Sequence, residues 1–182
     1  MPYFNKLIAV LALVVLVESN VKAQSDHECK YLSVITYLRT NVEINDRIKM
    51  FFPGIVKKKE KFIEFNLYDL IGFLGIVGMQ KQILEKGFLF DGDSLNAVSF
   101  SKKYFFMPIK SEFLTGLKWE NNSAKLFLSF SKPVGNYLMV ELTDFDPELT
   151  GGRKFGNAMQ FFFKFSSSGV IEDKLYAGSA YN

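Results

Sequence analysis

The last third of the chain alternates between apolar and polar residues in four segments, and this alternation constrains the fold more than any other feature. The segments are separated by the turn-forming stretches "KPVGN", "DPELTGGRKFGN" and "SSG". Alternation with a period of two is typical of strands that bury one face, and connections of this composition favour hairpins. The sequence therefore predicts an antiparallel meander with strands over Lys125–Ser131, Tyr137–Phe145, Ala158–Ser166 and Val170–Ala177.

One face of this predicted sheet has the composition of a hydrophobic core. Neighbouring residues of a strand point to opposite faces, so every second residue of a segment shares one side. Burying each large apolar side chain contributes about 1.5–3 kcal/mol before entropy is subtracted. Three segments each supply an apolar row: Leu126, Leu128 and Phe130; Leu138, Val140 and Leu142; Met159, Phe161, Phe163 and Phe165.

The opposite face mixes aromatic and thioether side chains with charged and amide groups. Such a mixture is typical of a ligand pocket, which is mainly apolar with a few placed polar groups. Two alternatives stay open: a helix or second layer covers this face, or cross-strand aromatic pairs stabilise a solvated one. The candidate ligand-binding residues are Phe127, Tyr137, Met139, Glu141, Gln160, Phe162, Lys164 and Tyr176. Glu172 and Lys174 are expected beside Tyr176 on the same face.

Two helices are predicted upstream of the sheet. The first carries apolar residues at a spacing of three, beginning at Cys29 and continuing through Leu32, Ile35 and Leu38. This places the Cys29 thiol on a buried helix face, with a disulfide-linked dimer as the alternative. The second helix carries apolar residues at helical spacing and ends at Pro53-Gly54.

The middle of the chain has a less uniform pattern. Clean alternation predicts a half-buried strand over Phe62–Tyr68. Three glycines at Gly72, Gly75 and Gly78 weaken a helix, so the sequence predicts strand or loop through Val77. Beyond that point we expect a short helix to Lys86, a strand over Ala97–Phe106, and a loop or helical turn over Pro108–Trp119.

These elements predict an α+β fold in which N-terminal helices pack on a curved antiparallel sheet whose C-terminal four strands form a meander. The element order resembles that of small cone-shaped α+β folds such as the nuclear-transport-factor-2-like group. A resemblance of element order assigns no function by itself.

The N-terminus has the features of a secretory signal. Lys6 precedes the apolar run Leu7–Val17, and Val21-Lys22-Ala23 fits a cleavage site before Gln24. The run is too short to span a bilayer, so the membrane anchor is the weaker alternative. We therefore expect residues 1–23 to be a signal peptide, residues 24–182 to form a single domain, and the protein to be secreted or periplasmic.

The chain has few residues for histidine or cysteine chemistry. It contains one histidine, His27, and one cysteine, Cys29. Residues two apart on a helix point away from each other, and these two are too few for a zinc site. The acidic fragments "DFDPE" and "DGD" do not complete a calcium loop. The sequence predicts no catalytic residue, metal site or cofactor.

The charge balance indicates which partners fit. The net charge is +3, and the basic residues are almost all lysine, so the guanidinium groups that read phosphates and bases are scarce. We expect no nucleic acid partner. The leading hypothesis is an exported noncatalytic protein that binds a small apolar or amphipathic molecule, or a protein partner, on the aromatic-polar sheet face. The alternatives are a carboxylate-dependent enzyme using Glu141 or Glu64 and a structural or accessory subunit of an extracytoplasmic assembly.

Overall fold

A computed structural model describes residues 26–56, 63–71, 79–87, 109–117, 124–146 and 156–181. The predicted α+β fold is confirmed. The first described element is a helix over residues 26–40, called the N-terminal helix below. The elements that follow are α2 (Val42–Phe51), β1 (Asn66–Ile71), α3 (Gln80–Glu85), β2 (Ile109–Lys110), α5 (Glu112–Leu117), β3 (Phe127–Phe130), β4 (Tyr137–Thr143), β5 (Gly156–Phe165) and β6 (Ile171–Tyr181).

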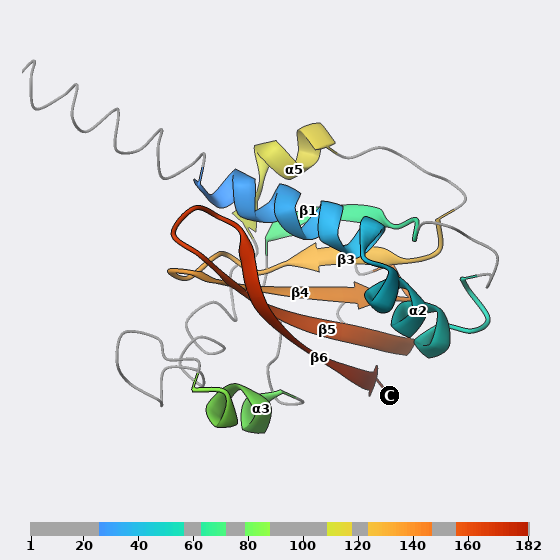
Figure 1. Ribbon diagram of the computed structural model, residues 1–182. Helices are drawn as coiled ribbons and strands as arrows, with labels where there is room; N and C mark the ends of the chain where they lie inside the picture. The colour runs from blue at the N-terminus through green and yellow to red at the C-terminus, as the bar shows by residue number, and fades with distance from the viewer. Residues whose placement is uncertain are drawn as a thin grey trace, which may run out of the picture.

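The strands form one sheet in the order β2-β1-β3-β4-β5-β6. Strands β3 to β6 pair antiparallel with their chain neighbours, which confirms the predicted meander. The pair β1 and β3 is parallel, with Leu67 opposite Leu128. The N-terminal helix and α2 cover one face of the sheet, and α3 lies on the other side (Figure 1).

The predicted core rows are confirmed. Each of the residues in the three apolar rows is buried in one cluster with residues of the N-terminal helix, α2 and β1. Within this layer the Phe163 ring packs against the Tyr37 ring in a T-shaped arrangement, with the two centroids 5.7 Å apart. The phenylalanines of β5 at alternate positions are therefore structural.

The N-terminal helix buries only part of the predicted face, because Ile35 and Leu38 are in the core and Cys29 and Leu32 are not. Its buried apolar residues are Tyr31, Val34, Ile35 and Leu38, whereas the Cys29 side chain is exposed and Leu32 is 43% exposed. The prediction of a buried thiol at Cys29 was wrong. A helix has 3.6 residues per turn, so residues spaced by three do not stay on one face. The series therefore starts on the exposed side at Cys29 and reaches the buried side at Leu38.

Helix α2 confirms the second predicted helix and its end before Pro53-Gly54. The Asn41 side chain caps its start by accepting a hydrogen bond from the Ile44 amide at 3.0 Å. Ile44 and Ile48 are fully buried, and the helix ends before Pro53. Phe51 projects from its last turn over Gly178 of β6.

The middle segments agree with prediction in part. Ile63, Phe65 and Leu67 are buried as the alternation predicts, but β1 begins only at Asn66 and continues to Ile71. The short helix before Lys86 is confirmed as α3, and the predicted helical turn is α5. The sequence did not predict β2, and the predicted strand over Ala97–Phe106 lies outside the described residues.

Gly178 provides a test of the contact between α2 and the sheet. A Cβ added at Gly178 would overlap the Phe51 ring. We expect Gly178→Ala to lower the free energy of unfolding by about 1–3 kcal/mol, as overpacking does. Gly116→Ala in α5 is the control, because its added Cβ meets nothing within 4 Å, and it should raise stability by up to about 1 kcal/mol, as Gly→Ala does in a helix. Chemical denaturation compares each variant with the wild-type protein, and a Gly178→Ala variant as stable as the wild-type protein would contradict the described contact.

Candidate functional site

The aromatic-polar sheet face is covered at its centre. Met139 and Phe162 are fully buried, packed with Met79 and Ile83 from the α3 segment and with Leu175 of β6. The Tyr137 ring stacks on Phe162 with its centroid 5.5 Å away. For these residues the structure shows the covering layer that the sequence left open as an alternative.

A polar pair lies beside this second cluster. Glu141 and Gln160 are opposite each other in the β4–β5 register, and the Gln160 Nε2 donates a hydrogen bond to Glu141 Oε1 at 2.9 Å. Both side chains are buried. Phe127 and Lys164 are half-buried at two ends of the same face, and Lys164 forms an ion pair with Glu172 at 3.0 Å. The binding role of these residues stays a prediction.

Tyr176 lies on the face opposite to the one expected. Lys164 pairs with Asp173 and Phe165 with Ile171, so Glu172 is an extra residue in β6. Such a bulge exchanges the faces of every residue beyond it. Tyr176 therefore pairs opposite Phe161 on the helix side, where the Arg47 guanidinium lies 5.4 Å from its ring centroid.

The same bulge moves Lys174 to the helix side. Its Nζ lies 5.4 Å from the Tyr37 ring centroid. In exchange, Leu175 joins the cluster formed by Met139 and Phe162. The structure thus brings seven of the eight predicted residues to one sheet face and separates Tyr176 from them.

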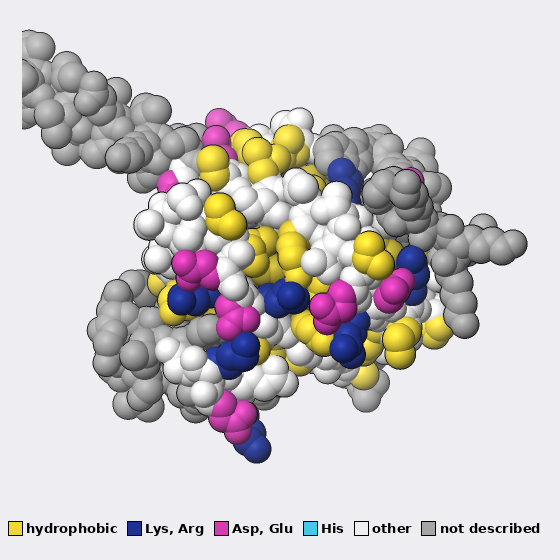
Figure 2. Space-filling model, viewed as in Figure 1, with side chains coloured by type: hydrophobic (Ala, Val, Ile, Leu, Met, Phe, Trp, Pro, Cys, Tyr) yellow, Lys and Arg dark blue, Asp and Glu magenta, His cyan; other side chains and the backbone are white. Residues whose placement is uncertain are grey.

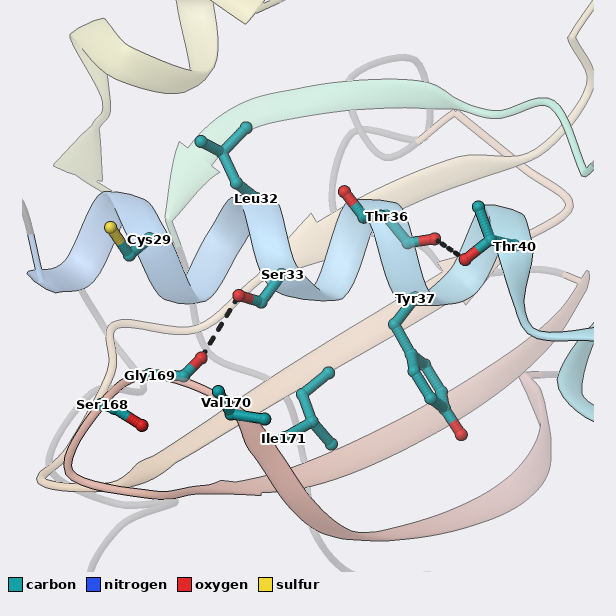
Figure 3. Close-up of a pocket in the computed structure, with 10 residues that line it drawn as sticks. All are labelled: Cys29, Leu32, Ser33, Thr36, Tyr37, Thr40, Ser168, Gly169, Val170 and Ile171. Carbon is teal, nitrogen blue, oxygen red and sulfur yellow. Dashed lines mark hydrogen bonds between the residues drawn. The ribbon is translucent and has the colours of Figure 1, made fainter.

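An open groove lies on the helix side of the molecule, between the N-terminal helix and the β5–β6 hairpin (Figure 3). Its volume is about 680 Å³. Figure 2 shows apolar side chains exposed on this face of the molecule. A band of acidic and basic side chains runs across the same face. The lining residues are Cys29, Leu32, Ser33, Thr36, Tyr37, Thr40, Ser168, Gly169, Val170 and Ile171.

The N-terminal helix forms one wall of the groove with a row of hydroxyl-bearing residues at helical spacing, separate from the apolar row that faces the core. Ser33, Thr36 and Thr40 recur on the side of the helix adjacent to its core face, together with Tyr37. The Thr40 hydroxyl donates to the Thr36 carbonyl at 2.8 Å, and the Ser33 hydroxyl donates to the Gly169 carbonyl at 3.3 Å. The last of these bonds links the helix directly to the hairpin (Figure 3).

The hairpin wall depends on a tight serine-glycine turn. The Ser166 hydroxyl oxygen accepts hydrogen bonds from the amides of Ser168 at 3.2 Å and Val170 at 3.1 Å. Gly169 has φ of 78°, in the left-handed region that glycine tolerates. The turn leaves the Val170 side chain 62% exposed at the groove.

None of the ten side chains that line the groove is a carboxylate, a lysine, an arginine or a histidine. Of the charges on β6 near the groove, Glu172 forms an ion pair with Lys164 and Asp173 forms one with Lys86 at 2.9 Å, while the Lys174 Nζ lies over the Tyr37 ring. The groove lining itself therefore consists of uncharged apolar and hydroxyl groups, with one ammonium group beside Tyr37. The stripe of small hydroxyl residues was the signal in the sequence that could have indicated it.

A smaller groove of about 360 Å³ lies near the start of the N-terminal helix, between that helix and α5. It is lined by His27, Glu28, Tyr31, Ile71, Lys110, Ser111, Glu112 and Phe113. Burial lowers the pKa of His27, and the charge of Lys30 lowers it further. Burial raises the pKa of the Tyr31 hydroxyl above its ordinary value.

No protein-family model, curated protein or solved structure matches the chain. The helices in the described ranges include none long and apolar enough to cross a membrane. Within the same ranges, no group of three or more histidine, cysteine, aspartate or glutamate residues could hold a metal ion.

The lowered pKa of His27 predicts a pH dependence of stability. The unfolded chain takes up a proton near pH 6.5, before the folded chain does, so protonation favours unfolding as the pH falls through that value. We expect the wild-type protein to lose stability between pH 7.5 and pH 5.5 relative to His27→Gln. Parallel denaturation curves at these pH values measure the difference, and a constant difference would contradict the described environment of His27.

Proposed function

We propose that this protein is an exported noncatalytic binding protein that holds a small, uncharged amphipathic molecule in the groove between the N-terminal helix and the β5–β6 hairpin. The observation that carries the proposal is the groove itself. Its volume of about 680 Å³ lies within the range of small-molecule sites, about 300–1,000 Å³. Its lining combines apolar contact area with hydroxyl groups and contains no acidic or basic side chain.

The apolar part of the ligand would contact Leu32, Tyr37, Val170 and Ile171. Burial of apolar surface against these side chains supplies the favourable free energy, about 25 cal/mol per Å². Tyr37 extends from the helix toward the hairpin beside Ile171 (Figure 3). Because its ring also packs on Phe163, it is held in place before a ligand arrives.

The hydroxyl groups indicate the polar end of the ligand. Ser33 and Thr40 donate their hydroxyl protons to backbone carbonyls. A serine or threonine oxygen that has donated its proton still has lone pairs to accept with. The ligand should therefore carry a hydrogen-bond donor, such as a hydroxyl or amide group, at its polar end.

The carboxylate enzyme receives less support from the geometry. Glu141 is 2% exposed and accepts a hydrogen bond from Gln160, and Glu64 is exposed on the chain before β1. Neither residue lines either of the two grooves described above. A general acid or base must reach the substrate proton, so these positions do not favour catalysis.

Binding in the groove can be measured with a neutral solvatochromic dye such as Nile red. We expect saturable binding to the wild-type protein and a Kd at least about tenfold higher for Val170→Glu, which is a loss of ~1.4 kcal/mol. The new carboxylate would lose hydration when the dye covers it. Val170 is 62% exposed, so the substitution should change stability little.

Val42→Glu is the matched control, because Val42 is 72% exposed in α2 and does not line the groove. Its dye affinity should equal that of the wild-type protein. Equal affinities of both variants and the wild-type protein would overturn the proposed site.

Export is tested separately by the mass of the secreted chain. The basic residue, apolar run and small-residue motif before Gln24 support cleavage at that point. We expect intact mass spectrometry of the protein recovered outside the cytoplasm to give the mass of residues 24–182. Native spectra of the same sample would show any bound molecule as mass that disappears on denaturation. Recovery only of the uncleaved chain would contradict the export proposal.

A further inference from the structure

Strand β6 forms one edge of the sheet. It pairs with β5 from Tyr181 opposite Gly156 to Ile171 opposite Phe165. Its other edge pairs with no strand among the described residues. An edge of this kind presents a row of backbone N–H and C=O groups that another extended chain can bind.

The first part of β6 has features that prevent such pairing. Glu172 is a bulge residue and forms an ion pair with Lys164, and Asp173 forms one with Lys86. Bulges and charged side chains are the devices by which native sheets protect their edges. In β6 the bulge and the charged side chains both lie within Glu172–Lys174.

The second part of β6, residues 175–181, has none of these protections. Its sequence, "LYAGSAY", contains no charge and no proline, and its register with β5 is regular. Part of both sheet faces is covered here: Phe51 lies over Gly178 and Arg47 over Tyr176 on the helix side, while Leu175 packs in the cluster beside α3. The outer backbone edge of this stretch pairs with no strand among the described residues.

We propose that this stretch pairs antiparallel with the same stretch of a second copy of the chain, about a two-fold axis at Gly178. In this register Gly178 is opposite itself, Ala177 is opposite Ser179, and Tyr176 is opposite Ala180. Tyr176 thus faces the small Ala180, Leu175 faces Tyr181 at the ends of the stretch, and every pair joins two uncharged residues. A two-fold interface requires such self-complementarity, whereas pairing through Glu172–Lys174 would bring charged residues and the bulge into the ladder.

The second copy also leaves the groove accessible. The groove includes Val170, which directly precedes β6, and Ile171, the first residue of β6, and both lie before the charged positions. The paired stretch begins after them, at Leu175. The dimer is therefore independent of ligand binding in the groove.

Sedimentation of the full secreted chain tests the proposal, in a Cys29→Ser background so that no disulfide can form. We expect a reversible monomer–dimer equilibrium. Two neighbouring substitutions, Ser179→Pro and Ala180→Pro, then separate dimerisation from folding. Consecutive residues of a strand direct their N–H groups to opposite edges, so one proline removes a donor to β5 and the other an outward donor.

The proline variant that keeps the wild-type melting temperature identifies the outward donor, and it should raise the dimer Kd at least about tenfold. A monomer at all concentrations would overturn the proposal, as would a dimer that this variant leaves intact. Hydrogen exchange of the wild-type chain gives a second readout. The amides of residues 175–181 should exchange more slowly as the protein concentration rises, and exchange independent of concentration would also overturn the dimer.

Discussion

The burial of β5 on both faces is the constraint on which the rest of the structure depends. Phe161, Phe163 and Phe165 face the N-terminal helix and α2, and Phe162 faces the α3 segment. Each phenylalanine contributes about 1.5–3 kcal/mol only if its surroundings exclude water. The strand therefore needs a layer on each side. Gln160 lies within this strand, and its burial is compatible with stability because Glu141 accepts its hydrogen bond.

The bulge at Glu172 determines how β6 meets these two layers. Without the extra residue, Tyr176 would lie opposite Gln160, and Leu175 would turn toward the helices. With it, Leu175 fills the cluster around Met139 and Phe162, while Tyr176 meets Arg47 of α2. Lys164 and Glu172 form an ion pair at the bulge. A single inserted residue thus supplies an apolar side chain to one layer and an aromatic ring to the other.

The sequence predicts those features that local periodicity determines. The alternation in β3, β4 and β5 runs without interruption, so their faces could be assigned residue by residue. The bulge in β6 could not be recognised, because "EDKLY" alternates equally well in either phase. The two-residue strand β2 is too short for any pattern. For the N-terminal helix, a spacing of three wrongly assigned Cys29 to the buried face. The helical period of 3.6 instead places Tyr31, Val34, Ile35 and Leu38 in the core.

The groove could not be predicted from the sequence for a different reason. It forms between residues 29–40 and residues 168–171, which no local pattern relates. What brings them together is the packing of Tyr37 on Phe163 and the hydrogen bond from Ser33 to Gly169. Both contacts exist because the helix and β5 share one core. The predicted pocket face and the observed groove thus both depend on β5. The α3 segment covers the pocket face, whereas the groove stays open between the N-terminal helix and the β5–β6 hairpin.

The order of residues along β6 keeps the two proposed surfaces apart. Val170 and Ile171 belong to the groove, the paired charges of Glu172 and Asp173 follow, and the uncharged edge begins at Leu175. An apolar ligand and an extended chain both bind to surfaces whose desolvation costs little free energy. If the charged residues were absent, one continuous uncharged strand would border both surfaces, and a second copy could slide along it into the groove. Because charged groups lose hydration only at a high cost, this short block fixes the register of any pairing and keeps the groove open.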